Sequence, residues 1–119
     1  MLIYSISNED FLYRRLSKNN PHYWKIINGQ AVPTSFGFKT KPNEDGLSVN
    51  IAALITPEKA VLNYPNDCVA EISASFPISK GYNCLHKPSK SNFSHAIIEG
   101  DTNPIARELS MAVTQVFQF

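Results

Sequence analysis

Short segments that alternate apolar and polar residues predict strands in the first part of the chain. Residues 2–6 alternate in this way and end at Ser7-Asn8, so we expect a short strand there. Residues 11–16 fit either a helical turn or a short strand, and Asn19-Asn20-Pro21 ends whichever element forms. Residues 23–27 predict a strand that enters a tight turn at Asn28-Gly29, because this dipeptide tolerates positive φ.

The middle of the chain continues the same pattern. Residues 35–38 and 47–51 predict two strands on either side of the polar loop 39–46. Residues 68–76 are rich in small and apolar side chains and predict a further strand. Residues 95–100 predict a short buried strand that ends at Gly100.

Two segments carry the signals that start helices. Thr56-Pro57-Glu58 combines a capping residue, a proline at the first helical position and an early carboxylate, which predicts a helix to about Asn63. Thr102-Asn103-Pro104 starts a second helix, which we expect to reach about Phe117. Its apolar stripe at helical spacing consists of Ile105, Leu109, Ala112, Val113 and Val116.

Strands with few helices predict an α+β fold in which a mostly antiparallel sheet is covered by two helices, the longer one C-terminal. The chain has 119 residues, a mass of 13.3 kDa and 43% hydrophobic residues. This size and composition predict a single domain over residues 1–119, with a core that needs no disulfide or metal.

The sequence also predicts the compartment. No apolar run approaches the ~20 residues that span a bilayer, and the N-terminus lacks a secretory signal, so we expect a cytoplasmic protein without a membrane partner. Cys68 and Cys84 are then expected to be reduced core thiols. These cysteines and the three histidines do not supply a metal-ligand set, and no glycine-rich phosphate loop is present, so we expect neither metal nor cofactor.

Charge is distributed unevenly along the chain, although the net charge is only +1. Residues 11–43 and 72–98 contain no acidic residue and hold nine of the eleven basic ones. If these two stretches are neighbours in the fold, they form a positive surface that attracts anions. The nine are Arg14, Arg15, Lys18, Lys25, Lys39, Lys41, Lys80, Lys87 and Lys90.

Aromatic side chains are interleaved with the first basic stretch. Tyr13, Trp24 and Phe36 are candidates to stack on a base while cations bind phosphate, which is how nucleotides and single strands are held. The alternative is that these aromatics belong to the core and that the lysines lie on solvated surface.

Arg14 and Arg15 are the densest pair of fixed positive charges. The planar guanidinium matches phosphate or carboxylate oxygens in pairs, so either residue is a candidate ligand contact. On a strand the two point to opposite faces, and we expect at most one of them in a given pocket. The alternative is an ion pair with Glu9, Asp10 or another acid.

His95 is the candidate catalytic residue, because an imidazole at the start of a strand exchanges protons near neutral pH. The alternative is a histidine at the edge of the core that bonds to the main chain. Lys87 lies in an expected loop and is a further ligand candidate. Ser35 and Ser48 lack a Gly-x-Ser-x-Gly elbow, so they are candidate ligand contacts rather than hydrolase nucleophiles.

Five segments share a pattern, namely Leu12-Tyr13-Arg14-Arg15, residues 33–38 with Ser-x-x-Phe, Gly46-Leu47-Ser48-Val49, residues 92–100 with His95-Ala96 and Gly100, and Ala106-Arg107-Glu108-Leu109. Together they resemble a group of small bacterial proteins of unassigned activity. The resemblance implies a bacterial origin and a shared site near Arg14, Ser35, Ser48 and His95. This chain departs from the pattern at Asn50, where an acid is usual, and at Phe93-Ser94, where Pro-Ala is common.

Two hypotheses of function follow. In the first, a positively charged pocket recognises an anionic ligand, which is a nucleotide, a dinucleotide or single-stranded nucleic acid. The protein is then either a binding protein or a small effector enzyme in which His95 moves a proton. In the second, the chain is a non-catalytic module that docks on a larger protein through an exposed strand edge or through residues 116–119, whose two phenylalanines are costly to expose.

Overall fold

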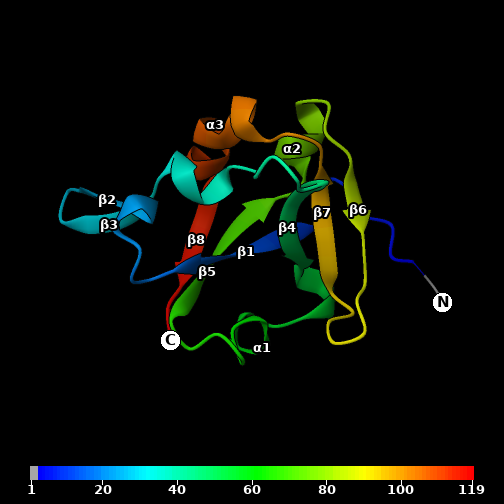
Figure 1. Ribbon diagram of the computed structural model, residues 1–119, viewed down its shortest axis with the longest axis horizontal. Coiled ribbons are helices and arrows are strands. Elements are labelled where there is room, and N and C mark those ends of the chain that lie inside the picture. The colour runs from blue at the N-terminus through cyan, green and yellow to red at the C-terminus, as the bar shows by residue number, and fades with distance from the viewer. Residues whose placement is uncertain (1–2) are drawn as a thin grey trace.

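A six-stranded antiparallel sheet organises the chain. The computed structural model describes residues 3–119 and places the strands in the order β6-β7-β4-β1-β5-β8, with β2 and β3 forming a separate hairpin (Figure 1). The strands are β1 (Phe11–Ser17), β2 (Trp24–Ile27), β3 (Gln30–Pro33), β4 (Gly46–Ile51), β5 (Asp67–Ser73), β6 (Cys84–His86), β7 (His95–Glu99) and β8 (Val113–Phe117).

The first strand shows how the sheet acquires two different faces. Residues 11–16, which fitted a helix or a strand, form β1, with Leu12 and Leu16 pointing into the main core. Tyr13 points to the opposite face and packs in a second, smaller cluster with Val69. Because side chains alternate along a strand, successive residues of β1 point in turn to one face and then to the other.

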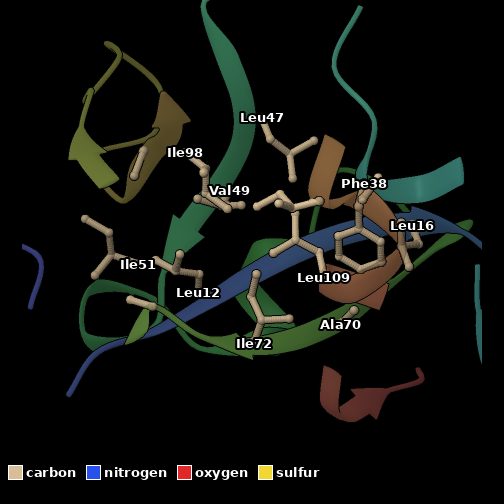
Figure 2. Packing of buried hydrophobic residues seen from close by; sticks show 14 of the residues in the cluster. Leu12, Leu16, Phe38, Leu47, Val49, Ile51, Ala70, Ile72, Ile98 and Leu109 are labelled. Atoms are coloured by element: carbon tan, nitrogen blue, oxygen red, sulfur yellow. The ribbon is translucent and has the colours of Figure 1, made fainter. Parts of the chain in front are cut away.

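The main core lies between the sheet and the helical segments at one face. In Figure 2 the apolar side chains of β1, β4, β5 and β7 gather around Phe38 and Leu109. Phe38 and Leu109 are fully buried, and each comes from a helical turn rather than from the sheet.

The fold class is confirmed as α+β, with an antiparallel sheet and the longest helix towards the C-terminus. The helices, however, are short, and they are more numerous than the two that we expected. Thr56 caps its helix as predicted, with Oγ1 accepting from the Lys59 N–H at 3.3 Å. The helix ends at Ala60, short of Asn63. The α-helices are α1 (Pro57–Ala60), α2 (Ser75–Ser79) and α3 (Ala106–Met111), and the 3-10 helices are η1 (Pro21–Tyr23), η2 (Ser35–Phe38), η3 (Ala52–Leu54) and η4 (Asn103–Ile105).

The prediction of one C-terminal helix to Phe117 is wrong. The helix ends at Met111, and the chain then forms β8, which pairs with β5 (Val69 opposite Phe117, Ala70 opposite Val116). The apolar residues from Val113 onwards therefore reach the core from an edge strand. Pairing with the open edge of β5 satisfies main-chain groups that a longer helix would have left exposed on the sheet.

Three other expectations are corrected. Residues 3–6 are not a strand; Tyr4 instead donates its N–H to His86 Nδ1 at 2.8 Å, and Leu2 lies outside the described residues. Residues 35–38 form η2, which turns Phe38 into the core. The strand predicted over residues 68–76 ends at Ser73, and α2 follows it.

The hairpin confirms the turn predicted at Asn28-Gly29. Both residues have positive φ, 52° and 78°, as a two-residue turn of this hand requires. The predicted strands at 47–51 and 95–100 are confirmed as β4 and β7. The sequence did not indicate β3 and β6. No helix within residues 3–119 is long and apolar enough to cross a membrane.

Candidate functional site

A pocket opens where β1 and β4 separate. The two strands pair only at Leu12–Ile51 and Tyr13–Asn50, so the sheet is split beyond that point. The pocket has a volume of about 190 Å³. It is lined by Tyr13, Arg14, Arg15, Ser48, Val49, Asn50, Tyr64, Asp67 and His95.

Arg14 bridges the split in the sheet. Its Nε donates to the Gly37 carbonyl and its Nη1 to the Ser48 carbonyl, both at 2.9 Å. Arg14 has no ion pair within residues 3–119. Burial lowers the pKa of the guanidinium, because a low-dielectric surrounding disfavours the charged form. The two bonds leave three of the five N–H donors for another acceptor.

Arg15 is neutralised by its neighbours. Its Nε lies 3.9 Å from Asp67 Oδ2, and its guanidinium lies over the Tyr64 ring at 3.7 Å from the ring centroid. Its Nη1 also donates to the Ala60 carbonyl at 3.3 Å. The expectation that only one arginine lines the pocket is wrong. Arg15 lies on the same face as Ser48. Arg14 points to the opposite face, yet it also lines the pocket at the place where the two strands separate.

His95 and Ser48 form a directed hydrogen-bonded pair. His95 Nδ1 lies 2.8 Å from the Lys87 carbonyl oxygen, which can only accept, so Nδ1 carries the proton. In the neutral imidazole Nε2 is then the acceptor, and it lies 3.3 Å from Ser48 Oγ. The Ser48 hydroxyl therefore donates to His95 Nε2.

The strand register brings these two side chains together. Ser48 on β4 lies opposite Ile97 on β7, and His95 is two residues earlier on the same strand and the same face. Such diagonal neighbours are within reach of a long side chain. Asn50, directly opposite His95, accepts from Asn92 Nδ2 at 2.7 Å and fastens the loop that leads into β7.

A second hollow of about 240 Å³ shares Ser48 and His95 with the pocket. The Ser48–His95 pair therefore lies between two recesses, and both recesses are lined by charges of both signs. The remaining residues that line the second hollow are Glu44, Asp45, Gly46, Lys87 and Ile97.

The structure brings five of the nine predicted site residues into the pocket: Tyr13, Arg14, Arg15, Ser48 and His95, with Lys87 in the adjoining hollow. Trp24, Ser35 and Phe36 line neither recess. Trp24 donates its Nε1–H to the Ser17 carbonyl at 2.9 Å, and the ring of Phe36 packs beside His22 and Tyr23.

Sequence reasoning missed Tyr64 and Asp67. No signal in the sequence marks them, because Tyr64 lies in the irregular segment after α1 and Asp67 is the first residue of β5. The two basic stretches meet only in part. Arg14 and Arg15 come from the first stretch and His95 from the second. Among the lysines of the two stretches, Lys87 lines the second hollow and the others line neither recess.

Tyr13 adds a neutral hydroxyl to the pocket. Burial raises the pKa of this phenol, with Glu71 and Glu58 adding to the shift, so the group stays protonated and can donate. Over the described part of the chain, no three His, Cys, Asp or Glu side chains gather closely enough to hold a metal ion. The pocket therefore offers two guanidinium groups, one of them paired with the Asp67 carboxylate, together with hydroxyl and amide groups and one imidazole.

Comparison with protein-family models, curated proteins and solved structures finds no match to this chain. The resemblance to a group of small bacterial proteins stays a prediction.

Proposed function

We propose that the pocket at the split between β1 and β4 binds a small molecule through a phosphate group, with a nucleotide as the class to test first. Arg14 is the anchor of this site. The observation that carries the proposal is its partly buried guanidinium, which is held by two carbonyl oxygens and has no carboxylate partner in the described chain.

An unpaired, desolvated cation favours an anion as its partner. Two carbonyl dipoles hold the Arg14 side chain in place, but they do not cancel its charge. A phosphate that accepts from the remaining N–H groups would gain charge-assisted hydrogen bonds, and the arginine would lose little mobility on binding because it is already fixed.

The dimensions of the site favour a small ligand over a nucleic acid strand. A volume of about 190 Å³ is below the roughly 300–1,000 Å³ of pockets that enclose drug-sized molecules. It suits a phosphate with part of a sugar, and the adjoining hollow of about 240 Å³ can take the next group. Trp24 and Phe36 lie elsewhere. The two aromatic rings of the pocket are already engaged, Tyr13 with Phe117 and Tyr64 with Arg15, which disfavours stacking on the bases of a single strand.

Calorimetric titration tests this proposal. The full chain is titrated with inorganic phosphate, AMP and NAD, and a labelled oligonucleotide is followed by anisotropy, each at low and at physiological salt. We expect saturable binding of the small phosphates that weakens with salt. Absence of binding at low salt, or oligonucleotide binding that survives Arg14→Met, would contradict the proposal.

The docking hypothesis has support from a different surface. A groove of about 770 Å³ runs between the β2–β3 hairpin and the edge strand β8. It contains Lys25 and Arg107 but no acidic residue, and Ile27 and Met111 are exposed beside it. The occupant that fits is an extended acidic peptide that adds to the free edge of β8.

The C-terminal tail itself is part of the folded structure. The Phe117 ring packs edge-on against Tyr13 at 5.9 Å between centroids, so truncation after Gln115 is expected to cost stability. Selection of short random peptides on the full chain tests docking without this complication. Enriched acidic, alternating peptides whose binding is lost in Ile27→Asp would support docking in the groove, and enrichment unaffected by that change would exclude it.

A further inference from the structure

The Ser48 hydroxyl has the surroundings of a nucleophile, although no sequence motif marks it. The Lys87 carbonyl fixes the proton of His95 on Nδ1 and turns the lone pair of Nε2 towards Ser48 Oγ. A base that is oriented by a third group and faces a hydroxyl is the arrangement that activates serine in unrelated hydrolases. The distance of 3.3 Å is at the long end for a hydrogen bond, as is common before substrate binds.

Hydrogen bonds to the main chain hold both His95 and Ser48 in this orientation. Lys87 donates its N–H to the His95 carbonyl at 2.9 Å, so the same residue holds His95 by both its main chain and its ring. Ser48 is fixed in a similar way, because its carbonyl accepts from Arg14. β4 and β7 lie side by side (Figure 1), so both members of the pair stand on paired strands rather than on a loose loop.

We propose that Ser48 is a catalytic nucleophile, activated by His95, that cleaves a phosphate ester bound at Arg14. This inference rests on the proposed function, because Arg14 supplies the contact that places the phosphorus atom near Ser48. Arg14 and Ser48 line the same pocket, and the charge that spreads over the phosphoryl oxygens during transfer would lie beside the guanidinium.

The chemistry balances with water as the only co-reactant. Ser48 Oγ attacks phosphorus as His95 Nε2 takes the hydroxyl proton, the Oγ–P bond forms and the ester P–O bond breaks on the opposite side of phosphorus. The departing alkoxide takes a proton from a water molecule, and the imidazolium returns its proton to the hydroxide that remains. In the second half a water molecule attacks the phosphoseryl group, His95 takes a proton from the water and returns it to Ser48 Oγ. The products are an alcohol and the remaining phosphate.

Labelling of the full chain with a neutral fluorophosphonate tests the nucleophile directly, because this reagent forms a stable bond with an activated serine and does not need an anion site. Intact mass and peptide mapping are expected to show one adduct, located on Ser48. Ser48→Ala should give none, and His95→Gln should slow labelling by about 100-fold. Ser5→Ala, a matched change of an exposed serine outside the pocket, should leave labelling unaltered.

Release of nitrophenolate from bis(4-nitrophenyl) phosphate gives the second readout, with circular dichroism to confirm that each variant is folded. We expect Arg14→Met to lose turnover while Ser48 still reacts with the fluorophosphonate. Phosphate binding without any Ser48 adduct would overturn this inference and leave the proposed function intact. An adduct on Ser48 without phosphate binding or ester turnover would overturn both the substrate class and the proposed function.

Discussion

Arg14 Nη1 donates to the main-chain carbonyl of Ser48 at 2.9 Å, across the gap where β1 and β4 no longer pair. In a continuous sheet that carbonyl would accept from a main-chain N–H of the neighbouring strand. Here a side chain takes over the role, so the two strands stay apart while the Ser48 carbonyl remains bonded. The opening is the pocket, and the group that bridges it carries the charge that the pocket presents to a ligand.

The two neighbouring arginines should differ sharply in their contribution to binding. Arg14→Met is expected to weaken AMP binding at least tenfold, because it removes charge-assisted bonds worth about 1.5–3 kcal/mol. Arg15→Met, the matched control, should change the affinity by less than about threefold, since Asp67 and Tyr64 already engage that guanidinium. Calorimetry on both variants checks the difference, and equal losses would show that Arg14 is not the anchor.

Asn50→Asp tests the electrostatics of the pocket without a change of shape. Asn50 is buried, and its Oδ1 accepts from Asn92 and Ser94. A carboxylate oxygen can accept the same two bonds, so the fold should be retained, with a loss of stability from burial of the charge. The new negative charge should weaken AMP binding about fivefold to tenfold at low salt and less at high salt. Asn43→Asp makes the same change of net charge on the exposed surface and should have little effect; a similar loss in both variants would contradict a local role.

Gly46 is predicted to be irreplaceable at the start of β4. An added Cβ would fall against the carbonyl oxygen and main-chain atoms of Ile98 and Glu99, which cannot move without breaking the pairing with β7. We expect Gly46→Ala to lower the free energy of unfolding by about 3 kcal/mol or more. Gly81→Ala has open space around it and a φ of +88°, so it should cost only about 1 kcal/mol. Urea unfolding of both variants checks this order.

Stability should fall in alkaline solution because of the two thiols. Burial raises the pKa of Cys68 and of Cys84 from 9.0 to about 11. Each thiol is more easily deprotonated in the unfolded chain, so its contribution is complete below pH 9 and is lost as the pH rises towards 11. The loss by pH 10 is about 1 kcal/mol per thiol.

Unfolding free energies measured at pH 8 and pH 10 check the alkaline effect. Cys84→Ala should show a smaller fall than the unaltered chain over this interval, since one of the two thiols has been removed. Identical falls in both proteins would mean that the Cys84 thiol titrates alike in the folded and unfolded states.

Local patterns predicted the elements whose own residues decide their structure. The alternation in β4 and β7 and the Asn28-Gly29 turn are examples, because burial of one face and a positive φ are properties of the segment itself. The C-terminal segment shows the opposite case. Val113 and Val116 continue the apolar spacing of a helix, yet they lie in a strand. The reason is that this segment pairs with the edge of β5, which is distant in the sequence.

The site was predictable in its residue types and not in its geometry. Uneven charge pointed to Arg14, and the position of His95 pointed to proton transfer. That Ser48 faces His95 depends on the register between β4 and β7, which no short motif encodes. The neutralisation of Arg15 by Tyr64 and Asp67 likewise depends on how the segment after α1 folds back on β1.

The most direct test of the central claim observes the Arg14 guanidinium itself. In a ¹⁵N-labelled protein, the Nε–Hε resonances of the two pocket arginines are assigned with the Arg14→Lys and Arg15→Lys variants and followed during titration with AMP. We expect the Arg14 resonance to shift and saturate at the same ligand concentration as calorimetry, with a much smaller change at Arg15. An Arg14 resonance that stays in place while AMP binds would show that the ligand lies elsewhere.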